Sequence, residues 1–255
     1  MKKRYLIYFS VFFTFMYLPI GVLFVNAFNS NRYGFKWDGF TFNWFEVMFD
    51  NRGLMEATFN SLFVAFTSSS LATVLGTGTA ITLYLYSVKG KKVLLSLLLV
   101  IMMIPDIIMG IAFLIFLMLF SFPLGFWSLL IAHTTFCLPF AALTVHSRLK
   151  DFDKHILDAA KDLGASEFET LRKVIIPMLL PAIVASWLLC FTLSMDDVIV
   201  SSFVTGPSFD VLPLKIFSMV KVGVKPEVNA LATIMITMSI LFVFISYLYL
   251  HKENN

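Results

Sequence analysis

The sequence predicts an all-α integral membrane protein with six transmembrane helices. Of its 255 residues, 59% are hydrophobic and only 14% are charged, whereas a soluble domain usually carries about a quarter charged residues. The charged residues cluster between apolar runs that are long enough for the roughly 20 residues needed to cross the hydrocarbon core. Because these runs do not alternate between apolar and polar residues, they predict helices and not the strands of a barrel.

The six expected spans follow the apolar runs in chain order. The first run comes after three basic residues, as in a signal peptide, but it is too long for one and is expected to be retained. The second is dense in small residues between Ser68 and Thr79, which let membrane helices approach closely. The spans are Tyr5–Ala27, Thr58–Tyr86, Val93–Phe120, Gly125–Val145, Met178–Val204 and Ala230–Leu250.

The fourth and fifth spans contain the two cysteines and a histidine. Neither the spacing nor the location of Cys137 and Cys190 suggests a disulfide or a metal site, so both are expected to be small packing residues. His133, in the fourth span, is expected to be a hydrogen-bonded packing residue, with a role in a transport pathway as the less favoured alternative.

The distribution of basic residues predicts the orientation of the spans. If the N-terminus is inside, 13 of the 19 Lys and Arg residues lie on the inner side. The excess of positive charge on that side predicts that both termini are cytoplasmic. The net charge of +3 then reflects membrane topology and does not indicate binding to nucleic acid.

Two expected outer segments interrupt the apolar pattern of what we expect to be a single domain, residues 1–255. The segment Phe28–Ala57 is rich in aromatic residues, which favour the membrane–water interface. We expect these residues to anchor the segment there, and docking of an external partner is the alternative. The segment Thr205–Asn229 contains an expected amphipathic helix from Leu212 to Lys221. This helix would lie on the membrane or cap a pathway.

The inner segment 150–177 is expected to fold as a helix, a glycine turn and a second helix. Asp153–Leu163 has a helix-compatible pattern, and Gly164 follows where a helix-terminating glycine belongs. Ser166–Glu169 has the capping-box pattern of a second helix start. Pro177 is expected to break that second helix before the fifth span. The short first helix exposes a small apolar face that should need a partner.

The inner segment contains a further set of residues at fixed spacing: Asp158, Ala159, Ala160, Gly164, Val174, Ile176 and Pro177. This pattern resembles the EAA motif of permeases in ABC importers. The spacing agrees throughout, although Asp replaces Glu, Val replaces Ile and Ile replaces Leu. The resemblance implies the type I importer permease fold, in which the segment is a coupling helix that docks on a separate ATP-binding subunit. It also implies that the residues serving ATPase coupling are Asp158, Ala159, Ala160, Gly164 and Pro177.

The chain itself is expected to be non-catalytic. It contains no G-x-x-x-x-G-K-[ST] sequence, since Gly90-Lys91-Lys92 lacks both the first glycine and the hydroxyl residue. We therefore expect no cofactor and no metal on this chain, with ATP and magnesium bound by the partner subunit.

Three acidic residues, Asp106, Asp196 and Asp197, lie inside expected spans, and no span contains Lys or Arg to neutralise them. Charges in a membrane are costly and tend to be functional. On a continuous helix Ser194, Asp197 and Ser201 would share one stripe, and a transported cation would be a suitable counter-charge. The alternative is that the acids cap helix ends. Both readings stay open for Asp106, whereas two adjacent acids exceed what capping requires.

Three further stretches carry a closer resemblance: Pro105-Asp106-Ile107, Phe191–Pro207 and Val220–Ala230. They resemble permeases of bacterial spermidine/putrescine importers, and the resemblance covers nearly the whole chain. It implies a bacterial inner-membrane location surrounded by lipid, a second permease subunit, a dimer of ATP-binding subunits and a periplasmic polyamine-binding protein. It also implies that a polyamine passes between the permeases, with Asp106, Asp196 and Asp197 as substrate-binding residues.

Two other classes of function remain as rivals. A self-sufficient secondary transporter or channel for a cation would use the acids as proton or ion sites, and it predicts gradient-driven uptake by this chain alone. A membrane scaffold without transport predicts that the intramembrane acids are dispensable.

Overall fold

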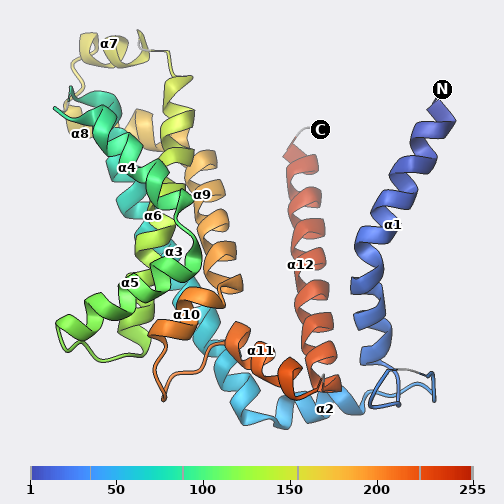
Figure 1. The fold of residues 1–255 in the computed structure, drawn as a ribbon. Helices are drawn as coiled ribbons and strands as arrows, with labels where there is room; N and C mark the ends of the chain where they lie inside the picture. Colours follow the sequence, from blue (N-terminus) through green and yellow to red (C-terminus); the bar gives the residue numbers. More distant parts are fainter. Residues whose placement is uncertain (1, 35, 88, 154, 224, 254–255) are drawn as a thin grey trace. The chain divides into compact units, whose positions relative to one another are not determined.

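The computed structural model describes residues 2–34, 36–87, 89–153, 155–223 and 225–253, and the side chains of residues 5–241 within them. Three residues of the segments considered above, Phe35, Lys154 and Val224, lie outside this description, as do the side chains of Lys252 and of the basic N-terminal residues. In the described part, the regular structure is helical apart from one isolated bridge between Asn29 and Phe40 (Figure 1). The predicted all-α fold is confirmed.

The described helices fall into two compact units, which are considered separately. The first unit comprises Met1–Met55 and Ile216–Asn255, and it contains α1 (Lys2–Ala27), α2 (Asn43–Asp50), most of α11 (Leu212–Val222) and α12 (Pro226–Glu253). The second unit comprises Glu56–Lys215. Its helices are α3 (Arg52–Leu85), α4 (Lys91–Met103), α5 (Asp106–Leu119), α6 (Phe126–Lys150), α7 (His155–Asp162), α8 (Glu167–Thr170), η1 (Leu171–Ile175), α9 (Ile176–Asp196) and α10 (Ile199–Val204).

In the first unit, α12 packs against both α1 and α2. At the start of α12, the buried Glu227 accepts a hydrogen bond from the Asn51 side chain at 3.0 Å and faces the Lys225 ammonium at 3.8 Å. The aromatic loop before α2 folds back on itself, and the rings of Phe28 and Phe40 stack with centroids 5.4 Å apart. Several other aromatic rings of this loop stay exposed, so its role as an anchor or as a docking surface stays a prediction.

The six predicted apolar runs all fall on helices. Among the described residues, α12 is apolar over Pro226–Leu241, and the pair α4 and α5 qualifies as one strongly bent span. The four described helices that are long and apolar enough to cross a membrane by themselves are Tyr5–Ala27, Arg52–Leu85, Phe126–Lys150 and Glu167–Asp196.

Two predicted spans are not the continuous helices that hydropathy indicated. The run Val93–Phe120 bends by 106° between α4 and α5. Pro105 has no N–H to donate and forces the preceding residue, Ile104, into an extended conformation. The run Met178–Val204 is interrupted at Asp197, which is extended at φ −68° and ψ 117° before α10 begins at Ile199.

The inner segment folds largely as predicted. Helix α7 ends in a glycine turn, and Ser166 and Glu169 form a reciprocal capping box at the start of α8. The prediction that Pro177 breaks the second helix is wrong, because α8, η1 and α9 follow one another without interruption. Pro177 is the second residue of α9, and the π-helical turn η1 lies directly before it. A π-helical turn contains one more residue than an α-helical turn, so the regular hydrogen-bond pattern already changes where the proline has no N–H to donate.

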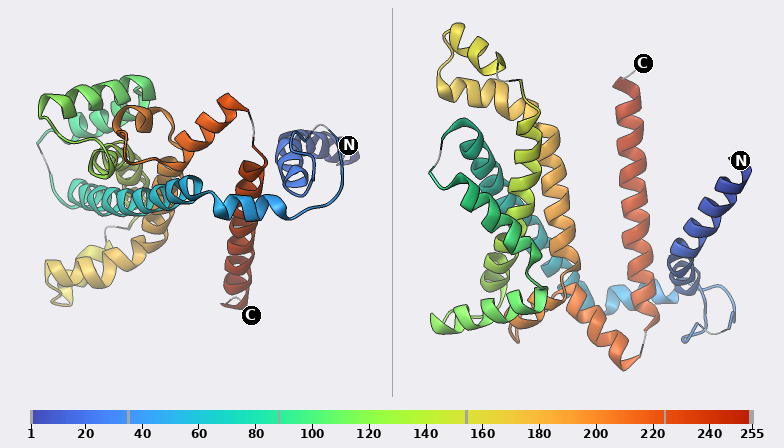
Figure 2. Two further views of the ribbon diagram at one scale, coloured as in Figure 1. Left: turned by 90° about the horizontal axis from the view of Figure 1, so that it is seen from below. Right: turned by 45° about the horizontal axis from the view of Figure 1, so that its top comes forward.

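Helix α3 packs closely against α6 and α9 in the second unit. Helices α6 and α9 run side by side (Figure 2). Cys137 and Cys190 are buried free thiols, and the sulfur of each lies 3.4–3.5 Å from the backbone oxygen of the other residue. This confirms their predicted role in packing. A Cβ atom at Gly76 of α3 would lie only 2.7 Å from the Ala141 side chain and from the Ala142 backbone of α6.

We expect Gly76→Ala to destabilise the second unit, because overpacking of a tight contact costs about 1–3 kcal/mol. Gly78→Ala is the matched control in the same helix, since its added methyl meets nothing within 4 Å and alanine has the higher helix propensity. The measurement is the temperature at which the protein, heated in detergent, loses its monodisperse peak in size-exclusion chromatography. This temperature should be lower for Gly76→Ala than for wild type, and it should be unchanged or higher for Gly78→Ala. Equal behaviour of the two variants would contradict the close approach of α3 and α6.

Candidate functional site

The two helix breaks of the second unit meet at one pocket of about 380 Å³. Asp106 enters it from the break between α4 and α5, and Asp196 and Asp197 enter it from the break between α9 and α10. The aromatic rings of Phe136 and Phe140, on α6, form part of the same lining. The structure therefore brings together the three acids that were predicted from the sequence.

Asp106 and Asp196 present exposed side chains at this pocket. Asp106 is the first residue of α5, where the free N–H groups of the first turn favour a negative charge. The position of Asp106 is therefore compatible both with binding a transported cation and with capping a helix end. Asp196 is the last residue of α9, an end at which the helix dipole offers no stabilisation to a carboxylate. Capping does not explain Asp196.

Asp197 has a different environment, because its carboxylate caps α10. Its Oδ1 accepts a hydrogen bond from the backbone N–H of Val200 at 3.1 Å, and its Oδ2 accepts one from Ser201 at 2.7 Å. The side chain is only 10% exposed. A contact between Asp197 and substrate stays a prediction, whereas its structural role as a cap follows directly from these bonds.

A buried histidine joins the two sides of this break. His133 of α6 lies with Nδ1 2.7 Å from the hydroxyl of Ser194 and with Nε2 3.1 Å from the hydroxyl of Ser201. Its Nε2 is also 3.6 Å from Oδ2 of Asp197. The expectation that His133 is a hydrogen-bonded packing residue is confirmed. The polar stripe predicted on a continuous helix is formed instead around this imidazole. No local sequence pattern places His133 beside Ser194 and Ser201.

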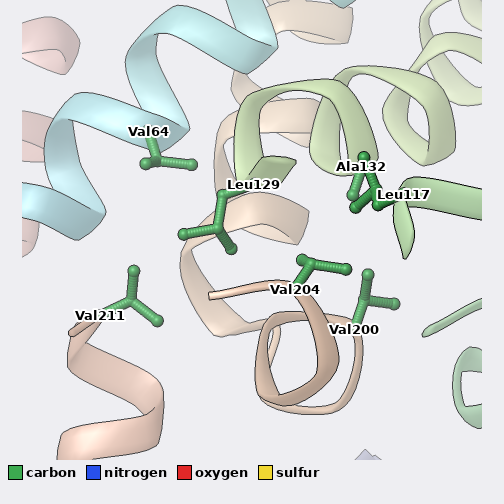
Figure 3. Close-up of a cluster of buried hydrophobic side chains, with 7 residues drawn as sticks. All are labelled: Val64, Leu117, Leu129, Ala132, Val200, Val204 and Val211. Atoms are coloured by element: carbon green, nitrogen blue, oxygen red, sulfur yellow. The ribbon is translucent and has the colours of Figure 1, made fainter. Parts of the chain in front are cut away.

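Helix α10 is fixed from several directions. Its Val200 and Val204 belong to a buried apolar cluster with residues of α3, α5 and α6 (Figure 3). The hydroxyl of Ser128, at the start of α6, lies 2.6 Å from the backbone oxygen of Val204. At Gly110 of α5, an added Cβ would lie 2.5 Å from the Phe203 ring. This close packing holds a six-residue helix that would not persist alone.

The inner segment forms a second candidate site. Gly164 adopts a left-handed conformation at φ +80°, and the N–H groups of Gly164 and Ala165 donate to the carbonyls of Lys161 and Ala160 at 2.8 and 3.0 Å. This is the hydrogen-bond pattern of a Schellman motif. The predicted residues Asp158, Ala159 and Ala160 lie on α7, which has no buried residue.

A pocket of about 640 Å³ opens between this segment and the end of α3. Asp158 lines it from α7, and Phe168, 68% exposed, lines it from α8. The hydroxyl of Tyr86, beyond the end of α3, donates to the Glu167 carboxylate at 3.3 Å. Leu163, beside the glycine turn, is 88% exposed. The segment therefore presents apolar side chains beside a groove, as a docking element would.

Comparisons with known proteins identify the family to which this chain is similar. The profile of the family described as "Binding-protein-dependent transport system inner membrane component" matches residues 72–253. The spermidine/putrescine transport system permease protein PotC of Escherichia coli (strain K12) is 54% identical over 94% of this chain and 90% of its own length. PotC of Haemophilus influenzae is 52% identical, with 96% and 95% covered. The putrescine transport system permease protein PotI of E. coli K12 is 35% identical, with 88% and 82% covered.

Solved structures show the same fold at lower identity. A chain of a bacterial ABC transporter involved in the import of the acidic polysaccharide alginate superposes with a TM-score of 0.72 at 17% identity, over 98% of this chain and 95% of that one. A chain of the MetNI methionine ABC transporter in an inward-facing conformation gives a TM-score of 0.61 at 17% identity, over 76% and 92%. At this identity the likeness concerns the fold alone.

Proposed function

The chain belongs to the family of binding-protein-dependent transport system inner membrane components, and from this premise we propose that it is a permease subunit of an ATP-driven importer for the polyamines spermidine and putrescine. Relatives that are named for polyamine transport, at up to 54% identity over most of the chain, support this substrate class. The observation that carries the proposal is the acidic pocket, in which three carboxylates meet and which no described Lys or Arg lines.

The pocket has the chemistry that an alkylammonium group needs. Asp196 and Asp106 supply negative charge without a basic neighbour in the described lining, and an ion contact is stronger where water is partly excluded. The faces of Phe136 and Phe140 add a surface that attracts cations. A polyamine carries its charges along a flexible apolar chain, so successive ammonium groups can exchange one carboxylate for another as the molecule moves.

ATP hydrolysis is assigned to a partner. The helix–glycine–helix segment with exposed Leu163 and Phe168 is the surface that would dock on a dimer of ATP-binding subunits, with Asp158, Gly164 and Pro177 in the coupling segment. ATP and magnesium would be bound there and not on this chain. A second permease subunit would complete the pathway, and a periplasmic polyamine-binding protein would deliver the substrate. The excess of basic residues on one side supports cytoplasmic termini in a bacterial inner membrane.

Reconstitution in proteoliposomes tests the proposal. We expect uptake of radiolabelled spermidine or putrescine only when this chain is combined with a partner permease, the ATP-binding subunits and the binding protein, and only with ATP. The same vesicles with an imposed ion gradient and without ATP are the control. Gradient-driven uptake by this chain alone would replace the proposal with a secondary transporter or channel in which Asp106, Asp196 and Asp197 are ion sites.

A further inference from the structure

The break between α9 and α10 has no proline or glycine to cause it. The chain from Ser194 to Ser201 reads Ser-Met-Asp-Asp-Val-Ile-Val-Ser, and none of these residues prevents a helix from continuing. The extended conformation of Asp197 therefore needs support from elsewhere in the fold. The cap on α10 supplies part of it, because the Asp197 carboxylate accepts two backbone hydrogen bonds that only a new helix start offers.

His133 supplies a further part, because it reaches both helices that flank the break. One ring nitrogen is 2.7 Å from Ser194 in the last turn of α9, and the other is 3.1 Å from Ser201 in α10. The hydroxyl of Ser194 is in turn 3.2 Å from that of Ser68 on α3. The imidazole is 2% exposed, so water does not compete for these bonds and their geometry is well determined.

The proton arrangement of this network follows from Asp197. Its carboxylate lies 3.6 Å from Nε2 of His133, where a lone pair on that nitrogen would be repelled and an N–H would be attracted. With the proton on Nε2, Nδ1 accepts from the hydroxyl of Ser194, and that oxygen accepts in turn from Ser68. Nε2 then donates to the hydroxyl of Ser201 at 3.1 Å, and its approach to Asp197 at 3.6 Å is an electrostatic contact and not a hydrogen bond.

We propose that His133 is a positioning residue for the cation site, an inference that rests on the proposed function. By holding Asp197 in the capping role, the imidazole fixes the direction in which α9 ends. Asp196, one residue before Asp197, is thereby presented to the pocket. Without His133, the break loses the side chain that contacts both of its ends, and Asp196 would be held less firmly toward the pocket.

A double-mutant cycle tests this role. ATP-dependent spermidine uptake is measured in the complete reconstituted system for wild type, His133→Leu, Asp196→Asn and the double variant, with assembly checked by size-exclusion chromatography. We expect His133→Leu alone to lose about tenfold, the effect of the two lost hydrogen bonds to the hydroxyls of Ser194 and Ser201. In the Asp196→Asn background it should lose less than about twofold further, because the residue through which it acts is already disabled.

Conservative variants separate positioning from packing. Gln at position 133 can still reach toward Asp197 and Ser201, whereas Asn reaches only the Nδ1 side, so His133→Gln should retain more uptake than His133→Asn. Cys137→Ala, at an equally buried position one turn further along α6, should stay within about twofold of wild type. If His133→Leu does not assemble, the cycle is run with His133→Asn.

The outcomes of the cycle distinguish the two proposals. Losses that multiply in the double variant, or a Cys137→Ala loss as large as that of His133→Leu, would overturn the positioning role and leave the cation site intact. An Asp196→Asn variant with wild-type uptake would overturn the cation site itself, and the positioning role would fall with it.

Discussion

Asp196→Asn is expected to reduce ATP-dependent polyamine uptake by about 10- to 100-fold, which corresponds to the loss of a contact of about 1.5–3 kcal/mol between a carboxylate and an ammonium group. The amide keeps the size of the side chain and removes only the charge. Because Asp196 ends a helix and has no capping role there, the substitution should leave the fold unchanged. The uptake assay in proteoliposomes measures this effect.

Two controls make this result specific. Glu46→Gln removes a carboxylate from the exposed face of α2, outside the pocket, and should leave uptake unchanged. Asp197→Asn should behave differently from Asp196→Asn, because it weakens the cap on α10 and should also lower the unfolding temperature. If Asp196→Asn and Glu46→Gln were indistinguishable, the pocket would not be the cation site.

Gly164→Val is expected to uncouple ATP hydrolysis from uptake, with the protein still inserted in the membrane. An added Cβ at Gly164 meets nothing within 4 Å, so lack of space is not the obstacle. The obstacle is the backbone, since φ is +80° and the left-handed region costs about 1–2 kcal/mol for an ordinary residue and more for a β-branched one. The turn lies in an exposed segment with little packing to enforce it, so the coupling surface would change shape.

The matched variant is Gly164→Asn, because asparagine tolerates the left-handed region better than other non-glycine residues. Gly164→Val should lose at least about tenfold in uptake, and Gly164→Asn should keep most of it. Stimulation of ATP hydrolysis by the loaded binding protein should follow the same order. Normal ATP-coupled uptake by Gly164→Val would contradict the assignment of this segment to coupling.

The parts of the fold that could be predicted have local causes. Gly164 and the Ser166–Glu169 capping box act through neighbouring residues, so the sequence was sufficient to place the glycine turn and the start of α8. Hydropathy likewise located every apolar run, because the membrane imposes one length on each of them. The rule that proline ends a helix failed at Pro177, because the chain passes there from a π-helical turn into α9 without leaving the helical conformation.

The parts that could not be predicted have tertiary causes. Hydropathy averages over a run and is insensitive to a change of direction, so it joined α4 to α5 and α9 to α10. Pro105 is a local cause for the first break, but no proline or glycine stands at Asp197. The second break depends on contacts with other helices, among them the contact with His133, which is 64 positions away in the chain. The division of roles between Asp196 and Asp197 depends on the same contact.

The two breaks that border the acidic pocket differ in permanence. The break at Pro105 is determined by the covalent structure of proline, because its ring nitrogen cannot donate a hydrogen bond in any conformation. The break at Asp197 is instead an equilibrium between a broken and a continuous helix. The hydrogen bonds to the Asp197 carboxylate and the contacts with the His133 imidazole favour the broken state over the helical hydrogen bonds that they replace. One side of the pocket therefore has a fixed backbone conformation, whereas the other side can change its conformation. A conformational change that starts at the distant coupling segment could alter the pocket at Asp197.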